Sequence, residues 1–248
     1  MIRPGDKKKP FLEHLEELRK RIILILISII LLSALSYTYS EKVLRFLARY
    51  IDSLVFISPQ EAFLCYLKIS LFSGLVLSAP VVLFNVLKFI WVALNKREKN
   101  IFVAYLIGGI FLFGLGIFFS YYIALPAAIN FLLSFSSDLI RPFISVAKYI
   151  SFSIFLILAF GMAFETPLFI VLLTRSGIVN SRTLRKQRKY FIILLFIISA
   201  MLTPPDVITQ VLLAVPLIML YEISILFAGI SEKRHRAGGS EGHFSAVK

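Results

Sequence analysis

The chain has 248 residues, of which 58% are hydrophobic and 17% are charged. Soluble domains usually contain about 25% charged residues, so one aqueous core would not bury this much Leu, Ile and Phe. The composition predicts a helical bundle solvated by hydrocarbon. The net charge of +13 does not indicate nucleic-acid binding, because the basic residues cluster in particular loops. The single cysteine, Cys65, excludes an intrachain disulfide and a multi-cysteine metal site.

Six apolar segments predict membrane-spanning helices. The first four have the roughly 17–25 residues that a spanning helix needs. The first follows basic residues, as a secretory signal does, but no small-residue cleavage site closes it, and we expect it to be retained. The segments are Ile22–Tyr39, Tyr66–Trp91, Ile101–Leu125, Tyr149–Leu173, Phe191–Leu202 and Val207–Ala228.

The fifth and sixth segments are expected to be short. A helix over Phe191–Leu202 would be about 18 Å long at ~1.5 Å per residue, against a hydrocarbon core of about 30 Å. It ends at Thr203-Pro204-Pro205-Asp206, and the sixth segment carries Pro216 and Glu222. The sequence therefore predicts an all-α, polytopic membrane protein with six transmembrane helices. Its short fifth and sixth helices would leave a concave, glove-like bundle.

The distribution of basic residues predicts the orientation of the spans. Of the 27 Lys and Arg residues, 21 lie in the two termini and in the loops 88–100 and 174–190, whereas five lie in 40–65 and 126–148. Because cytoplasmic loops are enriched in Lys and Arg, both termini are expected in the cytoplasm. We expect residues 1–230 to form the membrane domain and 231–248 a flexible cytoplasmic tail. The Gly-rich part of that tail is typical of residues added for expression.

Proline predicts bends in two of the spans. Pro80 lies within the second span and Pro167 within the fourth. A proline inside a helix removes one backbone hydrogen bond and bends the axis. Both helices are therefore expected to bend in mid-membrane.

Glu165 is the most conspicuous acidic residue, because it falls far inside the fourth apolar segment. A charge at the membrane centre costs about 2.5–3.5 kcal/mol on insertion scales and usually faces a cavity, a partner or a proton path. Two interpretations stay open for this side chain. It is either a neutral carboxyl that is hydrogen-bonded within the protein, or a polar docking or ion site.

Two further acids, Glu17 and Glu98, lie in basic segments that are predicted to face the cytoplasm. Either one alone is typical of a solvated surface charge. Together, such carboxylates could hold a basic peptide that lies along the membrane surface. Arginine would bind better than lysine, because a guanidinium pairs bidentately with a carboxylate.

The residues from Phe11 to about Ala228 carry six short motifs in a fixed order, and with them the chain resembles the TatC family, the multi-spanning receptor subunit of the twin-arginine protein translocase. Each motif is short, but their order over nearly the whole chain is specific. The motifs are His14-Leu15-x-Glu17-Leu18-Arg19-x-Arg21, Ser58-Pro59-x-Glu61, Ser78-Ala79-Pro80, Phe89-Ile90 through Ala93-Leu94 to Glu98, Phe160-Gly161-x-x-Phe164-Glu165-x-Pro167, and Leu202-Thr203-Pro204-Pro205-Asp206-Val207-x-x-Gln210.

The resemblance implies roles for particular residues. It implies recognition of twin-arginine signal peptides of folded cargo proteins at the cytoplasmic face. The residues that would bind the signal peptide are Glu98, Glu17, Phe89 and Arg19. Contacts with the membrane helix of a partner would fall on Thr203 and Gln210, with Glu165 facing the concave membrane surface. Val92 stands where the family usually has proline, which could change how rigidly the loop presents Glu98.

The resemblance also implies the cellular setting. The protein would lie in the bacterial cytoplasmic (inner) membrane as part of an oligomeric complex with single-span partners of the TatA and TatB type. The proton-motive force would drive transport. No cofactor is expected, because the sequence has no phosphate-binding glycine loop and no metal-ligand spacing.

One alternative function comes from a different class. A secondary transporter or proton-coupled channel could use Glu165 as its ion site, since such proteins place carboxylates at the midplane between broken helices. Few other polar residues lie in the spans, and no convincing inverted repeat accompanies Glu165. An intramembrane enzyme is disfavoured because no paired nucleophile and base occur.

Overall fold

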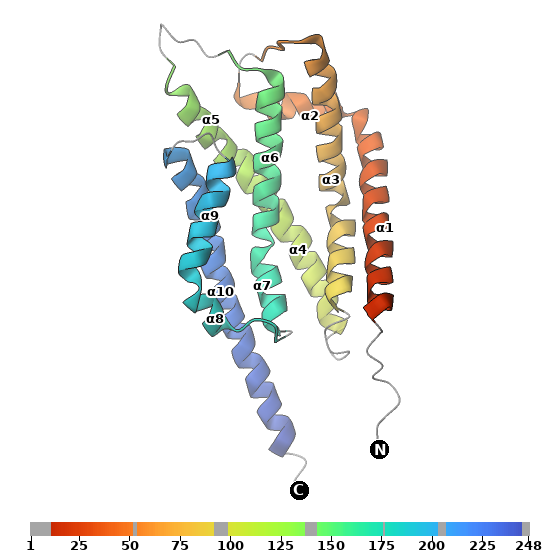
Figure 1. Cartoon of the computed structure of the whole chain (residues 1–248), viewed down its shortest axis with the longest axis vertical. Coiled ribbons are helices and arrows are strands. Elements are labelled where there is room, and N and C mark those ends of the chain that lie inside the picture. Colours follow the sequence, from red (N-terminus) through yellow and green to blue (C-terminus); the bar gives the residue numbers. More distant parts are fainter. Residues whose placement is uncertain are drawn as a thin grey trace. The chain divides into compact units, whose positions relative to one another are not determined.

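The chain is helical almost throughout in the computed structural model, which describes residues 11–51, 54–91, 99–136, 143–175, 177–202 and 207–244 (Figure 1). These residues contain no β-strand, only an isolated bridge between Val55 and Ser145. The expected all-α class is therefore confirmed. The chain divides into two compact units. Unit 1 comprises Met1–Phe46 and Ser58–Leu106, and unit 2 comprises Leu47–Ile57 and Ile107–Lys248.

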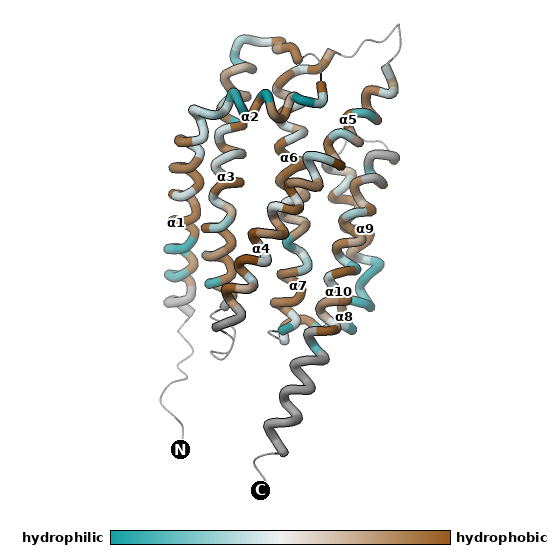
Figure 2. The backbone as a smooth tube through the Cα atoms, turned by 180° about the vertical axis from the view of Figure 1, so that it is seen from behind, coloured by the Kyte–Doolittle hydropathy of each residue, from teal (hydrophilic) through white to brown (hydrophobic). Residues whose placement is uncertain are grey.

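Unit 1 is built on two long antiparallel helices that lie side by side in Figures 1 and 2. They approach closely because small residues face each other: a Cβ added to Gly74 would lie 2.0 Å from Ser33 Oγ and 2.5 Å from Ser33 N. Ser70 Oγ donates a hydrogen bond of 2.5 Å to the carbonyl of Ser33. In lipid the hydrophobic effect does not drive helices together, and small residues at the contact permit the close van der Waals packing that does. The helices of this unit are α1 (Phe11–Tyr37), α2 (Ser40–Leu47), α3 (Pro59–Trp91) and the first turns of α4 (Lys99–Phe119).

In unit 2, α4 packs against the fourth span through glycine and phenylalanine. A Cβ on Gly116 would lie 2.6 Å from the carbonyl oxygen of Phe160, so only glycine fits there. The ring of Phe119 lies 5.3 Å from that of Phe160 and 5.6 Å from that of Phe164. α4 continues through a π-helical turn, η3 (Ser120–Ala124), into α5 (Leu125–Leu133). The fourth span consists of α6 (Val146–Phe164) and α7 (Thr166–Arg175).

The remaining helices of unit 2 pack around one hydrophobic cluster centred on Tyr221. Tyr221 stacks on Phe191 at 4.6 Å between ring centroids, and its hydroxyl donates a hydrogen bond of 3.0 Å to the carbonyl of Leu184. Ile170 and Ile225 are buried in the same cluster. The cluster therefore joins α7 to the three helices that follow. These are α8 (Ser181–Lys186), α9 (Arg188–Leu202) and α10 (Val207–Phe244).

Residues 47–57, which we call the strap, precede α3 in the chain but pack in unit 2. The strap includes the short helix η1 (Ala48–Tyr50). Its Val55 donates to the carbonyl of Ile144 at 3.1 Å and accepts from Val146 N–H at 2.9 Å. The hydroxyl of Tyr149 donates to the carbonyl of Leu47. These bonds hold the strap against the beginning of α6.

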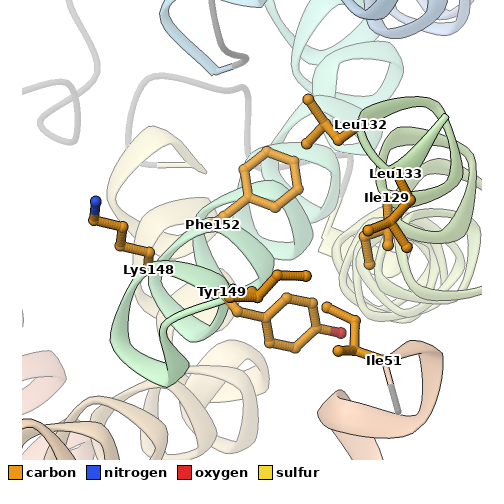
Figure 3. A pocket seen from close by; sticks show the side chains of 8 residues that line it. Ile51, Ile129, Leu132, Leu133, Lys148, Tyr149 and Phe152 are labelled. Carbon is orange, nitrogen blue, oxygen red and sulfur yellow. The ribbon is translucent and has the colours of Figure 1, made fainter. Parts of the chain in front are cut away.

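An apolar pocket of about 320 Å³ lies between the strap, α5 and the beginning of α6. In Figure 3 the ammonium of Lys148 points away from the ring of Tyr149. The other side chains that line the pocket are apolar. These side chains are Ile51, Ile129, Leu132, Leu133, Ile144 and Phe152.

The predicted spans correspond to observed helices. Among the described residues, four helical stretches are long and apolar enough to cross a membrane, and α1 with the bent segment after it is a fifth candidate. α1 and that segment meet at 83°. α9 has 15 residues, three more than the predicted segment, and is still short for a spanning helix. The structure is consistent with six spans without fixing that number.

The sixth helix is longer than the sequence predicted. α10 has 38 residues, although its span-like apolar part covers only Leu213–Ile230. Neither presumed interruption stops it, because Pro216 lies inside the helix and Glu222 pairs with Arg188 at 2.8 Å. The predicted boundary between the membrane domain and a tail from residue 231 stays a prediction.

The two prolines behave differently. α3 continues through Pro80 without interruption. The fourth span is interrupted at Glu165, two residues before Pro167, where the N–H of Glu165 bonds the carbonyl of Met162 at 3.1 Å. Since Pro167 has no N–H, the carbonyl of Ala163 lacks its normal helical donor. The helix therefore breaks before Pro167.

Candidate functional site

Unit 1 brings three of the predicted signal-peptide residues to the same end. Ser33 in α1 lies level with Gly74 in the antiparallel α3. Because both helices rise about 1.5 Å per residue, Glu17 lies level with the last turn of α3, which contains Phe89. The side chain of Phe89 is half-buried, and that of Arg19 is exposed. An acid, a cation and an aromatic ring therefore lie at the same end of unit 1.

Glu17 is already engaged by an arginine of its own helix. The guanidinium of Arg21 pairs with the Glu17 carboxylate, and the two side chains are 12% and 20% exposed. The neighbouring pair, Lys20 with Glu16, lies 3.0 Å apart and is largely exposed. Both follow the i, i+4 spacing of helical ion pairs. We did not assign Arg21 a role from the sequence, although its spacing from Glu17 was a sufficient signal.

Two of the predicted site residues, Glu98 and Thr203, lie outside the described residues. Their roles, in signal-peptide binding and in partner contact, stay predictions.

The motif Ser58-Pro59-x-Glu61, which was noted without a role, forms the beginning of α3. Pro59 is the first helical residue, and the N–H of Glu61 bonds the carbonyl of Ser58 at 3.0 Å. Proline at the first position and glutamate in the first turn both favour a helix start. Glu61 is 8% exposed. We interpret this motif as structural.

Glu165 occupies the break between α6 and α7, and its side chain is enclosed. The residue is 4% exposed, and neither carboxylate oxygen has a hydrogen-bond partner among the described residues. A polar group buried without a partner typically costs about 1–3 kcal/mol. The side chain is therefore buried in the isolated chain, and the expectation that it faces the concave membrane surface stays a prediction. The predicted role of Glu165 as an intramembrane polar contact stays a prediction.

Close helix packing is found on both sides of the break that holds Glu165. α4 contacts the fourth span on both sides of the break, since Gly116 meets Phe160 and Gly108 lies near Leu168. A Cβ on Gly161 would lie 2.9 Å from the ring of Phe113. Gly161 belongs to the same motif as Glu165, but sequence alone does not say which helix packs against it.

Gln210 bonds within the α9–α10 hairpin. Its Nε2 donates to the carbonyl of Phe196 at 3.0 Å. α7 and α10 run in the same direction (Figure 1), and Ile170 packs with Tyr221 and Ile225. At ~1.5 Å per residue, Gln210 therefore lies roughly 10 Å from the depth of Glu165. The structure does not bring these two residues to one level.

Comparison with known proteins identifies the family. The model of the family described as "Sec-independent protein translocase protein (TatC)" matches residues 13–216. The chain belongs to the TatC family. The TatC of Aquifex aeolicus is 40% identical over 235 residues, covering 92% of this chain and 98% of that protein. The TatC of Escherichia coli is 34% identical over 230 residues, covering 90% of this chain and 89% of its own sequence.

A solved TatC has the same fold. The crystal structure described as "Twin Arginine Translocase Receptor- TatC" superposes with a TM-score of 0.82 at 41% identity, covering 88% of this chain and 99% of that one. Like other TatC proteins, the chain is a multi-pass membrane component of a protein translocase and not an enzyme. Membership of TatC also argues against the alternative of a solute transporter that uses Glu165.

Proposed function

We propose that this TatC-family chain recognises twin-arginine signal peptides at the cytoplasmic end of unit 1, and that it then recruits single-span partners of the TatA and TatB type. Glu98 and Glu17 would bind the two guanidinium groups, with Phe89 and Arg19 beside them. Both termini would lie in the cytoplasm of a bacterium, with the chain in its inner membrane. Export of folded cargo would use the proton-motive force.

The ion pair between Glu17 and Arg21 carries the first part of this proposal. Glu17 binds a guanidinium within its own chain, in a partly buried position. The same carboxylate is therefore suited to a guanidinium supplied by a peptide, which would share it with Arg21 or displace Arg21. Lysine would be a poorer ligand, because its ammonium cannot make the two parallel bonds of arginine.

Crosslinking of signal peptides to the full-length protein in membranes tests this part. We would compare an Arg-Arg peptide with its Lys-Lys counterpart on wild-type protein, Glu17→Gln and Glu98→Gln. Losing a charged hydrogen-bond partner should weaken binding by about 1.5–3 kcal/mol. The matched control is Glu16→Gln, which removes an exposed acid one residue away and should leave binding unchanged. Full binding by both Glu17→Gln and Glu98→Gln would refute the assignment.

The second part concerns the membrane helix of a partner. Glu165, Thr203 and Gln210 remain our candidates for its polar contacts. Gln210 has one amide N–H on Phe196 and no second hydrogen-bond partner among the described residues, so its other amide atoms could serve a partner. Because Glu165 is enclosed, docking on it would include a local opening of the α6–α7 break. The unpartnered carboxyl supports such an opening, because exposure to a polar partner would relieve its burial.

Disulfide crosslinking tests the partner contacts. Cysteines beside Gln210 and Glu165 should crosslink to a single-span partner, and Glu165→Ala combined with Gln210→Ala should reduce those crosslinks. Signal-peptide binding should be retained, because Glu17 and Glu98 lie in other segments. If the double variant loses peptide binding and keeps its partner crosslinks, the proposed division of roles is wrong.

A further inference from the structure

Four exposed cations lie within eight residues of unit 2, on α8 and the beginning of α9. We call Arg182, Arg185, Lys186 and Lys189 the α8 basic face. None of them takes part in the ion pairs found among the described residues. Figure 2 shows the same stretch as a hydrophilic segment at the end of largely apolar helices. The face therefore presents positive charge that the described part of the chain does not neutralise.

Contacts with α10 hold the α8 basic face in place. Leu184, in the middle of it, is 5% exposed and packs in the cluster around Tyr221, whose hydroxyl bonds the Leu184 carbonyl. Ser181, the first residue of α8, donates its hydroxyl to Glu232 at 2.6 Å. The backbone that carries the four cations is thus held by packing and hydrogen bonds.

The nearby carboxylates are already used. Glu222 pairs with Arg188 at 2.8 Å, and Glu232 accepts from both the hydroxyl and the N–H of Ser181. Arg188 lies between Lys186 and Lys189 in sequence but does not belong to the face, because it is paired with Glu222. Charge on the face must therefore be balanced from outside these helices.

The residues after the face indicate its depth in the membrane. Lys189 Nζ lies 5.0 Å from the ring centroid of Tyr190, which is 63% exposed. In the next turn Ile193 and Leu194 are 58% and 48% exposed. Exposed isoleucine and leucine on a membrane helix face lipid tails, and tyrosine prefers the headgroup level. The four cations accordingly lie at the level of lipid phosphates.

We propose that the α8 basic face is a binding site for the phosphate groups of anionic phospholipids. The two arginines can each bind two phosphate oxygens, and the two lysines contribute point charges. Juxtamembrane cations attract anionic headgroups with an additive effect per charge. Zwitterionic lipids carry no net charge and would bind less well. This inference does not depend on recognition of signal peptides.

Native mass spectrometry of the full-length protein tests the site. The protein would be equilibrated with equal parts of phosphatidylglycerol and phosphatidylcholine, and the retained lipids counted. We expect retention of phosphatidylglycerol on wild-type protein to fall in R182Q/R185Q/K186Q/K189Q, by about fivefold in affinity for each charge removed. The matched control is K42Q/R45Q/R49Q/K148Q, which removes the same charge elsewhere and should keep the preference. If the quadruple variant does not fold, K186Q/K189Q changes two exposed lysines and should still lower retention.

Unchanged retention in the folded variants would overturn the proposal. An equal loss in the matched control would overturn it too, because net charge alone would then explain the effect. If retention is unchanged while poly-glutamate binds wild-type protein and not R182Q/R185Q/K186Q/K189Q, the face takes an acidic protein segment and the lipid proposal is wrong.

Discussion

Two glutamates of this chain lie in opposite environments. Glu17 lies at one end of unit 1, is 20% exposed and pairs with Arg21. Glu165 lies inside unit 2, is 4% exposed and has no partner for either carboxylate oxygen among the described residues. A paired acid near water can exchange one guanidinium for another at little cost in free energy. An enclosed and unpaired acid, by contrast, is stabilised whenever a hydrogen-bond partner reaches it. The first environment suits recognition, and the second suits a conformational step.

The strongest test of this difference places a cation at each position. Glu165→Lys would put an ammonium into an enclosed site within the membrane, at a cost of about 2.5–3.5 kcal/mol. We expect this variant to insert poorly or to lose a large part of its stability. Glu17→Lys should insert and fold, because its position is partly exposed. Thermal unfolding in detergent and membrane yield measure both; equal losses would abolish the distinction.

Replacing Glu165 with an apolar residue should raise the stability of the protein, whereas lysine should lower it. Glu165→Leu removes two unpartnered oxygens, so the free energy of unfolding should rise by about 1–3 kcal/mol. Partner crosslinking should fall in the same variant if the carboxyl serves docking. Glu165→Gln serves as the control, since it keeps a polar group of similar size. A Glu165→Leu protein that is less stable than wild type would mean that the carboxyl has a partner in the folded protein.

A smaller loss is expected at Glu17. Glu17→Gln breaks the pair with Arg21, and i, i+4 pairs near a surface contribute up to about 1 kcal/mol. Stability should therefore change little while Arg-Arg peptide binding falls. Glu16→Gln, which breaks the exposed pair with Lys20, should change neither quantity. A loss of more than about 2 kcal/mol on Glu17→Gln would show that the pair is structural.

The smallest expected effect is at the α9–α10 hairpin. Gln210→Leu removes the hydrogen bond to the Phe196 carbonyl, and such bonds in membranes average about 0.6 kcal/mol. Steric-trapping or unfolding measurements in lipid would detect a loss of that order. The exposed Val211 offers a control, since Val211→Leu leaves the bond intact. No loss on Gln210→Leu would mean that Gln210 is held for partners and not for the hairpin.

Sequence reasoning succeeded where the lipid environment itself dictates the pattern. Long apolar segments predicted the helices, because hydrocarbon permits no unpaired backbone, and motif order predicted the family. It was wrong where tertiary contacts decide. The sequence did not show that Glu222, expected to interrupt the sixth helix, pairs with Arg188, nor that Gly116 and Gly108 of α4 pack against the fourth span on either side of Glu165. Neither partner is adjacent in sequence, so no local pattern carries that information.

The strap has a consequence for the order in which the chain assembles during synthesis. Val55 bonds to Ile144 and Val146, which leave the ribosome about ninety residues later. At roughly 5–20 residues per second, the strap waits on the order of ten seconds for its hydrogen-bond partners. α1 and α3, by contrast, can join through Ser33 and Gly74 as soon as α3 is inserted. Assembly of unit 1 can thus precede closure of the strap, and a chain arrested before Ile144 would leave both of these backbone bonds of Val55 unmade.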